Sequence, residues 1–130
     1  MKKIILTSIF IAFAFFAFAQ SQMELNEMAY AEFSKADAEL NAVYQRIRTK
    51  YASDQKTLTG LRDAQRLWIQ FRDAQVKALY PIPIGGHMEK GYGSMYPQAK
   101  TQFETYLTQE RTQQLRQIYL EEKFENYNWN

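Results

Sequence analysis

Residues 25–47, LNEMAYAEFSKADAELNAVYQRI, decide the fold that we expect for this chain of 130 residues. Apolar side chains recur in this segment at intervals of three or four residues, which places them along one face of an α-helix. Neither proline nor glycine interrupts the segment. We therefore predict a long amphipathic helix over about residues 22–51. Its apolar face consists of Leu25, Ala29, Phe33, Ala36, Leu40, Val43 and Ile47.

A second apolar face with similar spacing follows, and it predicts a helix over about residues 54–79. Ala52, Ser53 and Asp54 supply the turn between the helices, and either Ser53 or Asp54 is a suitable cap for the second one. Because the turn is short, the two helices should form an antiparallel hairpin. Gly60 lies inside the second helix and costs it up to about 1 kcal/mol. The apolar face consists of Leu61, Ala64, Trp68, Phe71 and Ala78.

A long loop is predicted over residues 81–96, PIPIGGHMEKGYGSMY, because this stretch holds two of the three prolines and four of the five glycines. Ser94 is a suitable cap for a third helix with Pro97 in its first turn, ending near residue 122. The expected fold is an all-α domain in which a helical hairpin and a third helix are joined by this loop. The third helix's apolar face consists of Ala99, Phe103, Leu107, Leu115 and Ile118.

The amino terminus has the pattern of a secretory signal peptide. Lys2 and Lys3 precede an apolar run from residue 4 to residue 18, and small residues flank Phe18 at a potential cleavage site. A membrane anchor is the alternative, but about 15 apolar residues are fewer than the roughly 20 that a spanning helix needs. We predict cleavage between Ala19 and Gln20, which would release a soluble periplasmic or secreted chain. The predicted parts are a signal peptide (1–19), a helical domain (20–123) and a flexible tail (124–130).

Composition excludes several functions. The net charge of +2 comes from Lys2 and Lys3, so the chain after residue 19 is neutral, which argues against a nucleic-acid-binding surface. The absence of cysteine excludes disulfides, thiol catalysis and lipid attachment to a cysteine. A single histidine excludes a multi-histidine metal site, and no nucleophile motif is present. We therefore expect neither catalysis nor a metal ion or cofactor.

Several polar residues occupy positions where the helical pattern predicts burial. Because a buried charge is costly unless it is paired, we predict that Asp37 contacts Arg72 or Arg111 across a helix interface, with Asn41 and Gln65 completing the hydrogen bonds. Such a cluster could be a proton-transfer site or a structural network that fixes the helix register. The structural interpretation is favoured, because the sequence places no nucleophile or metal ligand near these residues. The expected core around the network contains Leu40, Tyr44, Trp68, Phe71, Leu107 and Leu115.

The same residues carry a resemblance to a known family. Residues 36–44, ADAELNAVY, resemble the AD-x-x-LN-x-x-Y motif of the LprI-type lysozyme-inhibitor-like proteins, which are small exported bacterial proteins. Residues 64–74, AQRLWIQFRDA, are similar to the family's AQR-x-W-x-x-F/Y-RDA motif. Gly85 and Gly86 match its GG, and residues 107–115 match its LT-x-x-R-x-x-x-L ending. These four motifs agree in order and spacing over about residues 24–118.

The chain differs from this family in two respects. Members commonly carry cysteines expected to form disulfides, and here Met28, Val76 and Phe103 stand at such positions. These apolar replacements fit a core that relies on packing instead of crosslinks. The segment after Gly86, HMEKGYGSMY, is also longer than is usual in the family.

The resemblance implies inhibition of lysozyme, an enzyme that cleaves glycan with two carboxyl groups in a cleft. Lys90 and then His87 are the expected carboxylate contacts, although both also suit a simple solvated loop. The alternative is a module that binds another envelope protein or a cell-wall fragment through aromatic residues such as Tyr92, Tyr96, Tyr127 and Trp129. The sequence leaves the oligomeric state open. The candidate partner-binding loop residues are Gly85, Gly86, His87, Lys90, Tyr92 and Ser94.

Overall fold

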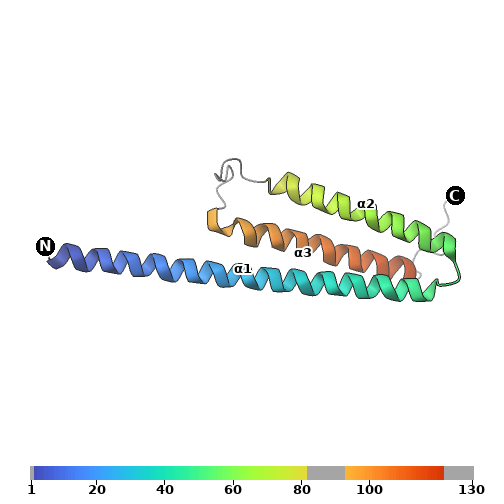
Figure 1. Cartoon of the computed structure of the whole chain (residues 1–130), viewed down its shortest axis with the longest axis horizontal. Helices are drawn as coiled ribbons and strands as arrows, with labels where there is room; N and C mark the ends of the chain where they lie inside the picture. Colours follow the sequence, from blue (N-terminus) through green and yellow to red (C-terminus); the bar gives the residue numbers. More distant parts are fainter. Residues whose placement is uncertain (1, 82–92, 122–130) are drawn as a thin grey trace.

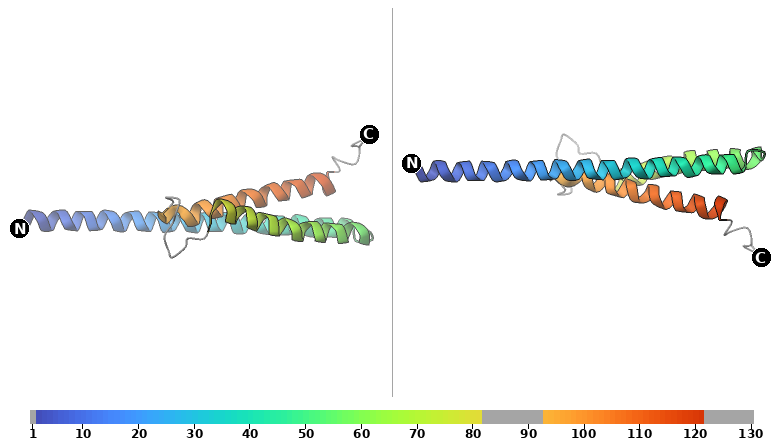
Figure 2. Two further views of the ribbon diagram at one scale, coloured as in Figure 1. Left: turned by 90° about the horizontal axis from the view of Figure 1, so that it is seen from above. Right: turned by 90° about the horizontal axis from the view of Figure 1, so that it is seen from below.

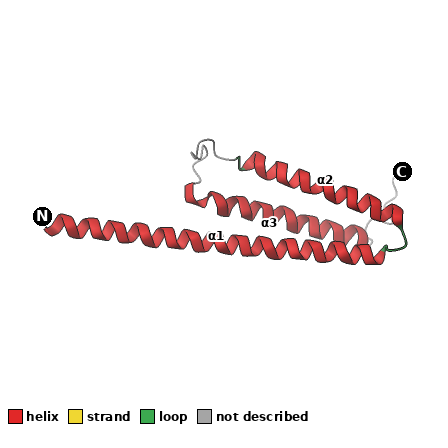
Figure 3. Ribbon diagram, viewed as in Figure 1, coloured by secondary structure: helices red, strands yellow, loops and turns green. Residues whose placement is uncertain are grey.

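The computed structural model describes residues 2–81 and 93–121, with the backbone alone for residues 2–19 and Ser94, and this part of the chain contains helices and no strand (Figures 1 and 3). The all-α, three-helix prediction is confirmed. The long helices are α1 (Lys2–Lys50), α2 (Gln55–Leu79) and α3 (Tyr96–Leu115). A 3-10 turn, η2 (Gly93–Met95), precedes α3, and a π-helical turn, η3 (Arg116–Leu120), follows it.

The turn between α1 and α2 is fixed by Asp54, which is the N-cap of α2. Its carboxylate accepts hydrogen bonds from the backbone N–H of Thr57 at 3.0 Å and from the hydroxyl of Thr57 at 2.6 Å. These bonds, led by the one from the hydroxyl, lower the pKa of Asp54 below its ordinary value. Of the two caps suggested by the sequence, the structure selects Asp54.

The beginning of α3 differs from the prediction. Met95, rather than Ser94, is the N-cap, and its side chain makes no capping hydrogen bond. Pro97 lies in the first turn, as expected, where proline's missing N–H costs nothing. Gly93 has a φ of 49°, which a residue with a side chain adopts only under strain, so glycine suits the entry into η2.

The third helix packs mainly along α1 and makes less extensive contact with α2. In Figure 1, α3 is seen between the antiparallel arms of the hairpin, and Figure 2 shows it crossing α1 at a shallow angle. The buried centre lies toward the α1–α2 turn, where Tyr44, Tyr51, Trp68, Tyr119 and Leu120 pack against it. This core cluster consists of Leu40, Val43, Ile47, Leu61 and Leu115.

The buried face of α3 carries three threonines beside Leu115, whereas Ala99, Phe103 and Leu107 of the predicted apolar stripe are only partly buried. Thr105, Thr108 and Thr112 are buried, and each donates its hydroxyl to the carbonyl four residues earlier at 2.8–2.9 Å. Because these bonds satisfy the hydroxyl within the helix, a buried threonine can pack like a small apolar residue. Ile118, predicted on this face, is exposed instead.

The predicted core is partly wrong. Leu40 and Leu115 are buried, and Tyr44, Trp68 and Leu107 are partly buried. Phe71, however, is 55% exposed, because α3 takes most of the surface of α1 against which that side of α2 was expected to pack. Leu25 and Met28 on α1 are also exposed, so Met28 does not replace a crosslink by packing, whereas Val76 is buried.

Two predicted parts of the chain remain untested by the structure. The proposed tail, 124–130, lies outside the described residues. The proposed cleavage point between Ala19 and Gln20 falls within α1. Within residues 20–81 and 93–121, whose side chains are described except for that of Ser94, none of the helical segments combines the length and hydropathy needed to cross a bilayer.

Candidate functional site

The main polar feature of the bundle is a cluster built around Trp68 on α2, which we call the arginine–tryptophan cluster; it comprises Gln65, Trp68, Arg72, Glu104 and Arg111. The guanidinium carbon of Arg72 lies 5.3 Å from the Trp68 ring, and that of Arg111, from α3, lies 5.9 Å from it. Both distances are within the range of cation–π attraction. The indole therefore joins two cations from two different helices.

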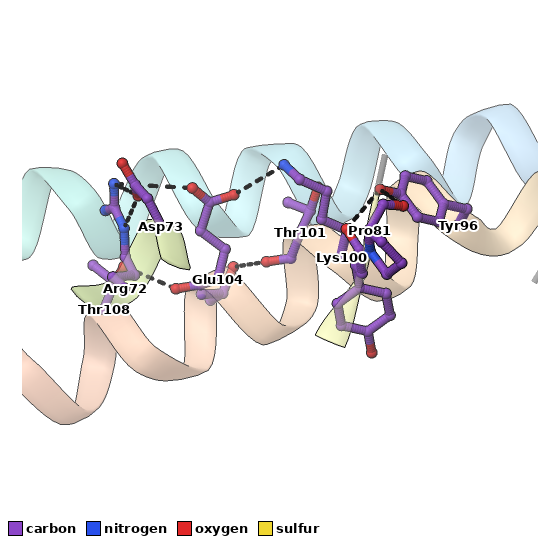
Figure 4. Close-up of polar contacts among 10 residues, drawn as sticks. Arg72, Asp73, Pro81, Tyr96, Lys100, Thr101, Glu104 and Thr108 are labelled. Carbon is purple, nitrogen blue, oxygen red and sulfur yellow. Dashed lines mark hydrogen bonds and ion pairs between the residues drawn. The ribbon is translucent and has the colours of Figure 1, made fainter. Parts of the chain in front are cut away.

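Arg72 links all three helices, as Figure 4 shows in part. Its guanidinium bonds Asp73 at 2.9 Å and reaches Glu104 of α3 at 3.9 Å. It also lies 5.9 Å from the ring of Phe33 on α1. Because the Arg72 side chain is only 12% exposed, these partners replace most of the water that the charge would otherwise hold.

Arg111 provides a direct side-chain hydrogen bond between the middle parts of α3 and α2. Its Nε donates to Oε1 of Gln65 at 3.1 Å, and its Nη1 makes a longer contact, 3.5 Å, to Oε1 of Gln114. Burial lowers the pKa of Arg111, although the guanidinium remains a cation at neutral pH. Gln65 and Arg111 were both members of the predicted network, although a direct bond between them was not predicted.

The predicted link from Asp37 to Arg72 or Arg111 is wrong. Asp37 is partly buried and accepts a hydrogen bond from Asn41 of the same helix at 3.1 Å. Glu104 is the carboxylate that reaches Arg72 instead. The sequence held a signal for it, because Glu104 lies seven residues before Arg111 and so shares its side of α3.

A second feature, the loop base, joins the end of α2 to the start of α3 through Tyr80, Pro81, Tyr96 and Phe103. The hydroxyl of Tyr96 donates to the carbonyl of Tyr80 at 2.9 Å and to that of Pro81 at 3.1 Å (Figure 4). The Tyr80 ring packs edge-on against Tyr96 at 6.2 Å and lies 6.0 Å from Phe103. Tyr96, expected as an exposed partner contact, is thus engaged within the protein.

Most of the predicted loop site lies outside the described residues. This applies to Gly85, Gly86, His87, Lys90 and Tyr92, and to the candidate aromatic contacts Tyr127 and Trp129. The backbone of Ser94 is described and belongs to η2. The loop base is therefore the part of this candidate site whose geometry is defined.

A polar groove lies where α1 meets the end of α3. Arg116 and Glu39 form an ion pair across it at 2.6 Å, and Gln109, Gln113 and Gln117 contribute amides to its walls. Neither in this groove nor in the rest of the described ranges is a group of three His, Cys, Asp or Glu side chains arranged to hold a metal ion.

The fold and these clusters define a small helical bundle whose principal polar residues bind its own helices together. The chain belongs to the LprI lysozyme inhibitor family, whose sequence model matches residues 17–115. It is also 34% identical over 111 residues to an uncharacterised protein of Rhizobium meliloti, an alignment that covers 77% of this chain and 75% of that protein. No solved structure matches the fold closely enough to be significant.

Four of the five residues of the arginine–tryptophan cluster come from two of the motifs that suggested this family. Gln65, Trp68 and Arg72 come from the AQR-x-W segment and its RDA ending, and Arg111 comes from the LT-x-x-R segment. Their partners in the structure lie within the bundle. The members of these two motifs that lie in the cluster therefore connect helices of the scaffold.

Proposed function

We propose that this protein is an exported, non-catalytic inhibitor of lysozyme that binds the enzyme through residues 82–92. The family match supports the inhibitory function. The observation that carries the choice of segment is the loop base, where Tyr96 bonds the carbonyls of Tyr80 and Pro81. A segment whose two ends are held together in this way loses less conformational entropy on binding than a free one.

Residues 82–92 carry the chemistry that the cleft of lysozyme requires. The enzyme cleaves glycan with two carboxyl groups, and an inhibitor must supply a cation or hydrogen-bond donors to satisfy them. Lys90 is our first candidate for this contact, and His87 is the second. Gly85 and Gly86 allow the tight turns by which a short segment can enter a cleft.

The amino-terminal pattern fits this function, because lysozyme acts on the cell wall outside the cytoplasm. The apolar run between Lys3 and Ala19 is suited to export. All residues of the core cluster follow Gln20, so the proposed cleavage would leave the core intact in the released chain.

A lytic assay tests the proposal. Residues 20–130 are purified and added at micromolar concentration to several types of lysozyme acting on a cell-wall suspension. We expect slower lysis by at least one type, and about a tenfold weaker effect for Lys90→Ala, as for the loss of one charged contact. Lys35→Ala, which removes an exposed lysine from α1, is the matched control and should leave inhibition unchanged.

Two results would contradict the proposal. Undiminished lysis by every lysozyme tested would exclude inhibition. Equal inhibition by the parent chain, Lys90→Ala and His87→Ala would exclude these contacts while leaving inhibition intact. In the first case, retention of a single envelope protein in a pull-down would favour the alternative of a module that binds another envelope component.

A further inference from the structure

Helix α2 carries a second apolar face that contacts no other part of the described bundle extensively. Its two large members, Leu67 and Phe71, are 59% and 55% exposed. Its members follow one another at spacings of four, three, four, three and four residues, which is the repeat of a coiled-coil seam. We call this face the α2 stripe, and it consists of Gly60, Ala64, Leu67, Phe71, Ala74 and Ala78, all of which are exposed.

The α2 stripe is distinct from the face that α2 turns toward the core. At about 100° per residue, its members lie roughly a third of a turn around the helix from the buried Leu61 and Val76. A Cβ atom added to Gly60 would meet no atom within 4 Å, so no neighbour within the described bundle explains the glycine there. An exposed apolar face of this regularity is typical of a protein–protein contact.

The order of residues along the α2 stripe is symmetric about Ile69. The two large residues stand two positions to either side of Ile69, and the four small ones stand five and nine positions away. If two copies of α2 met in antiparallel orientation about a twofold axis at this point, Leu67 would face the partner's Phe71. The small residues would face one another at both ends, where they would allow close approach. Such self-complementarity is what a twofold interface requires.

The charges beside the α2 stripe fit the same arrangement. Asp63, Gln70 and Lys77 are seven residues apart and lie along one flank of it. In an antiparallel pair, equivalent flanking positions meet in reverse order, so Asp63 would meet the partner's Lys77 and Gln70 would meet its own copy. In a parallel pair this flank would instead face the opposite flank of the partner, so Asp63 and Lys77 would not meet. The charge order therefore selects the antiparallel orientation.

We propose that a second copy of this chain docks on the α2 stripe, forming an antiparallel α2–α2 dimer. The symmetric residue order argues for this occupant, because an unrelated partner would require no symmetry about Ile69. One helix pair makes a narrow interface, so the dimer belongs to the weak, rapidly exchanging class. The dimer leaves the loop base and the segment that it closes outside the α2 stripe, so this inference does not depend on inhibition of lysozyme.

Sedimentation velocity over a range from about 1 to 300 µM tests the dimer. The protein is produced from the full-length gene, and its amino terminus is determined by mass spectrometry. We expect a concentration-dependent shift from monomer to dimer. Leu67→Ser should raise the dissociation constant at least about tenfold, because it removes a large apolar side chain from the centre of the interface. Ile69→Ser, which replaces a 42% exposed side chain on another side of α2, is the matched control and should change little.

Exchanging the charges of Asp63 and Lys77 distinguishes a lost dimer contact from a folding defect, because only a lost contact is restored in the double variant. Asp63→Lys and Lys77→Asp should each weaken the dimer, whereas the double variant should restore it, since the pair is merely reversed. Because the chain has no cysteine, Gln70→Cys should also crosslink to its own copy with a short bismaleimide, and Ile69→Cys should not. Circular dichroism checks that each variant is helical.

Three outcomes would overturn the proposal. The first is a monomer at every concentration, and the second is an equal effect of Leu67→Ser and Ile69→Ser. The third is a double charge variant as weak as its parents. If Leu67→Ser abolished inhibition of lysozyme by a protein that remained monomeric, the α2 stripe would serve that enzyme rather than a second copy.

Discussion

The Nε of Arg111 on α3 donates a hydrogen bond to Oε1 of Gln65 on α2 at 3.1 Å, in the part of the bundle where two guanidinium groups also lie within 6 Å of the Trp68 ring centroid. This contact joins two motifs that are 46 positions apart in the chain. In the folded protein, Gln65 and Arg111, which the sequence suggested as members of a polar cluster, connect two helices.

The double variant that removes both members of this pair should lose less free energy of unfolding than the two single variants lose in sum. We expect Arg111→Leu to lower the free energy of unfolding by about 1–3 kcal/mol, because it leaves the Gln65 amide without its partner and removes a cation from Trp68. Gln65→Leu should cost about 1 kcal/mol. The double variant should be less destabilised than the sum of the two singles. Urea unfolding followed by circular dichroism measures all three, and strict additivity would show that the bond contributes nothing.

Thr108 is completely buried, and its hydroxyl bonds the carbonyl of Glu104 within α3. We expect Thr108→Val to change the free energy of unfolding by less than about 1 kcal/mol, because that carbonyl belongs to the helix and the methyl group remains. Thr108→Ser, which removes the methyl group, should be destabilising by about 1 kcal/mol. Thermal unfolding of both variants distinguishes methyl packing from hydrogen bonding, and the reverse order would show that the hydroxyl has a partner beyond its own helix.

Gly60 is a position where a substitution should stabilise the monomer. Because the space around it is open and its backbone is helical, Gly60→Ala should raise the free energy of unfolding by about 0.5–1 kcal/mol. The measurement is made at low micromolar concentration, where a weak dimer does not contribute. Ala64→Gly, one turn further along the same face, should produce a loss of similar size, and a destabilised Gly60→Ala variant would contradict the helical account.

Asp54 makes stability depend on pH in the acid range. Its pKa is lower in the folded protein than in the unfolded chain, mainly through the hydroxyl and backbone bonds from Thr57. The stabilisation is therefore fully present above the unfolded pKa, near 4, and disappears as pH falls through the folded value. The stability difference between the parent chain and Asp54→Ala should be constant from about pH 5 to 8 and shrink below about pH 4. Ser53→Ala, at the adjacent exposed position, is the control, and a pH-independent Asp54→Ala difference would refute this assignment.

Tyr96 links stability to the proposed function. Tyr96→Phe keeps the ring that packs against Tyr80 but removes the hydroxyl that donates to two carbonyls. We expect a loss of about 1 kcal/mol in the free energy of unfolding, together with weaker inhibition of lysozyme because the loop ends are no longer held. Tyr106→Phe removes a hydroxyl from an exposed tyrosine of the same helix and should alter neither property.

The threonine face of α3 and the exposed Phe71 show where sequence patterns were insufficient. A search for apolar periodicity treats threonine as polar, so it selected Phe103 and Ile118 instead of Thr105 and Thr112. The error has a physical cause, since a helix supplies an acceptor for a threonine hydroxyl from its own backbone. Glu104 was missed although its spacing places it on the same side of α3 as Arg111, because helical spacing does not show which of several carboxylates reaches Arg72.

The sequence by itself determined the elements: three helices, the turn at Asp54 and the end of α2 follow from local periodicity, capping chemistry and proline and glycine placement. The family followed separately, from the resemblance of four short motifs. The tertiary structure alone decided which faces those helices bury. Because α3, rather than α2, packs along the buried face of α1, Arg72 pairs with Glu104 rather than Asp37, and one apolar face of α2 remains exposed. A helix pattern fixes which residues share a face, but which face is buried depends on competition among helices for the same contact surface.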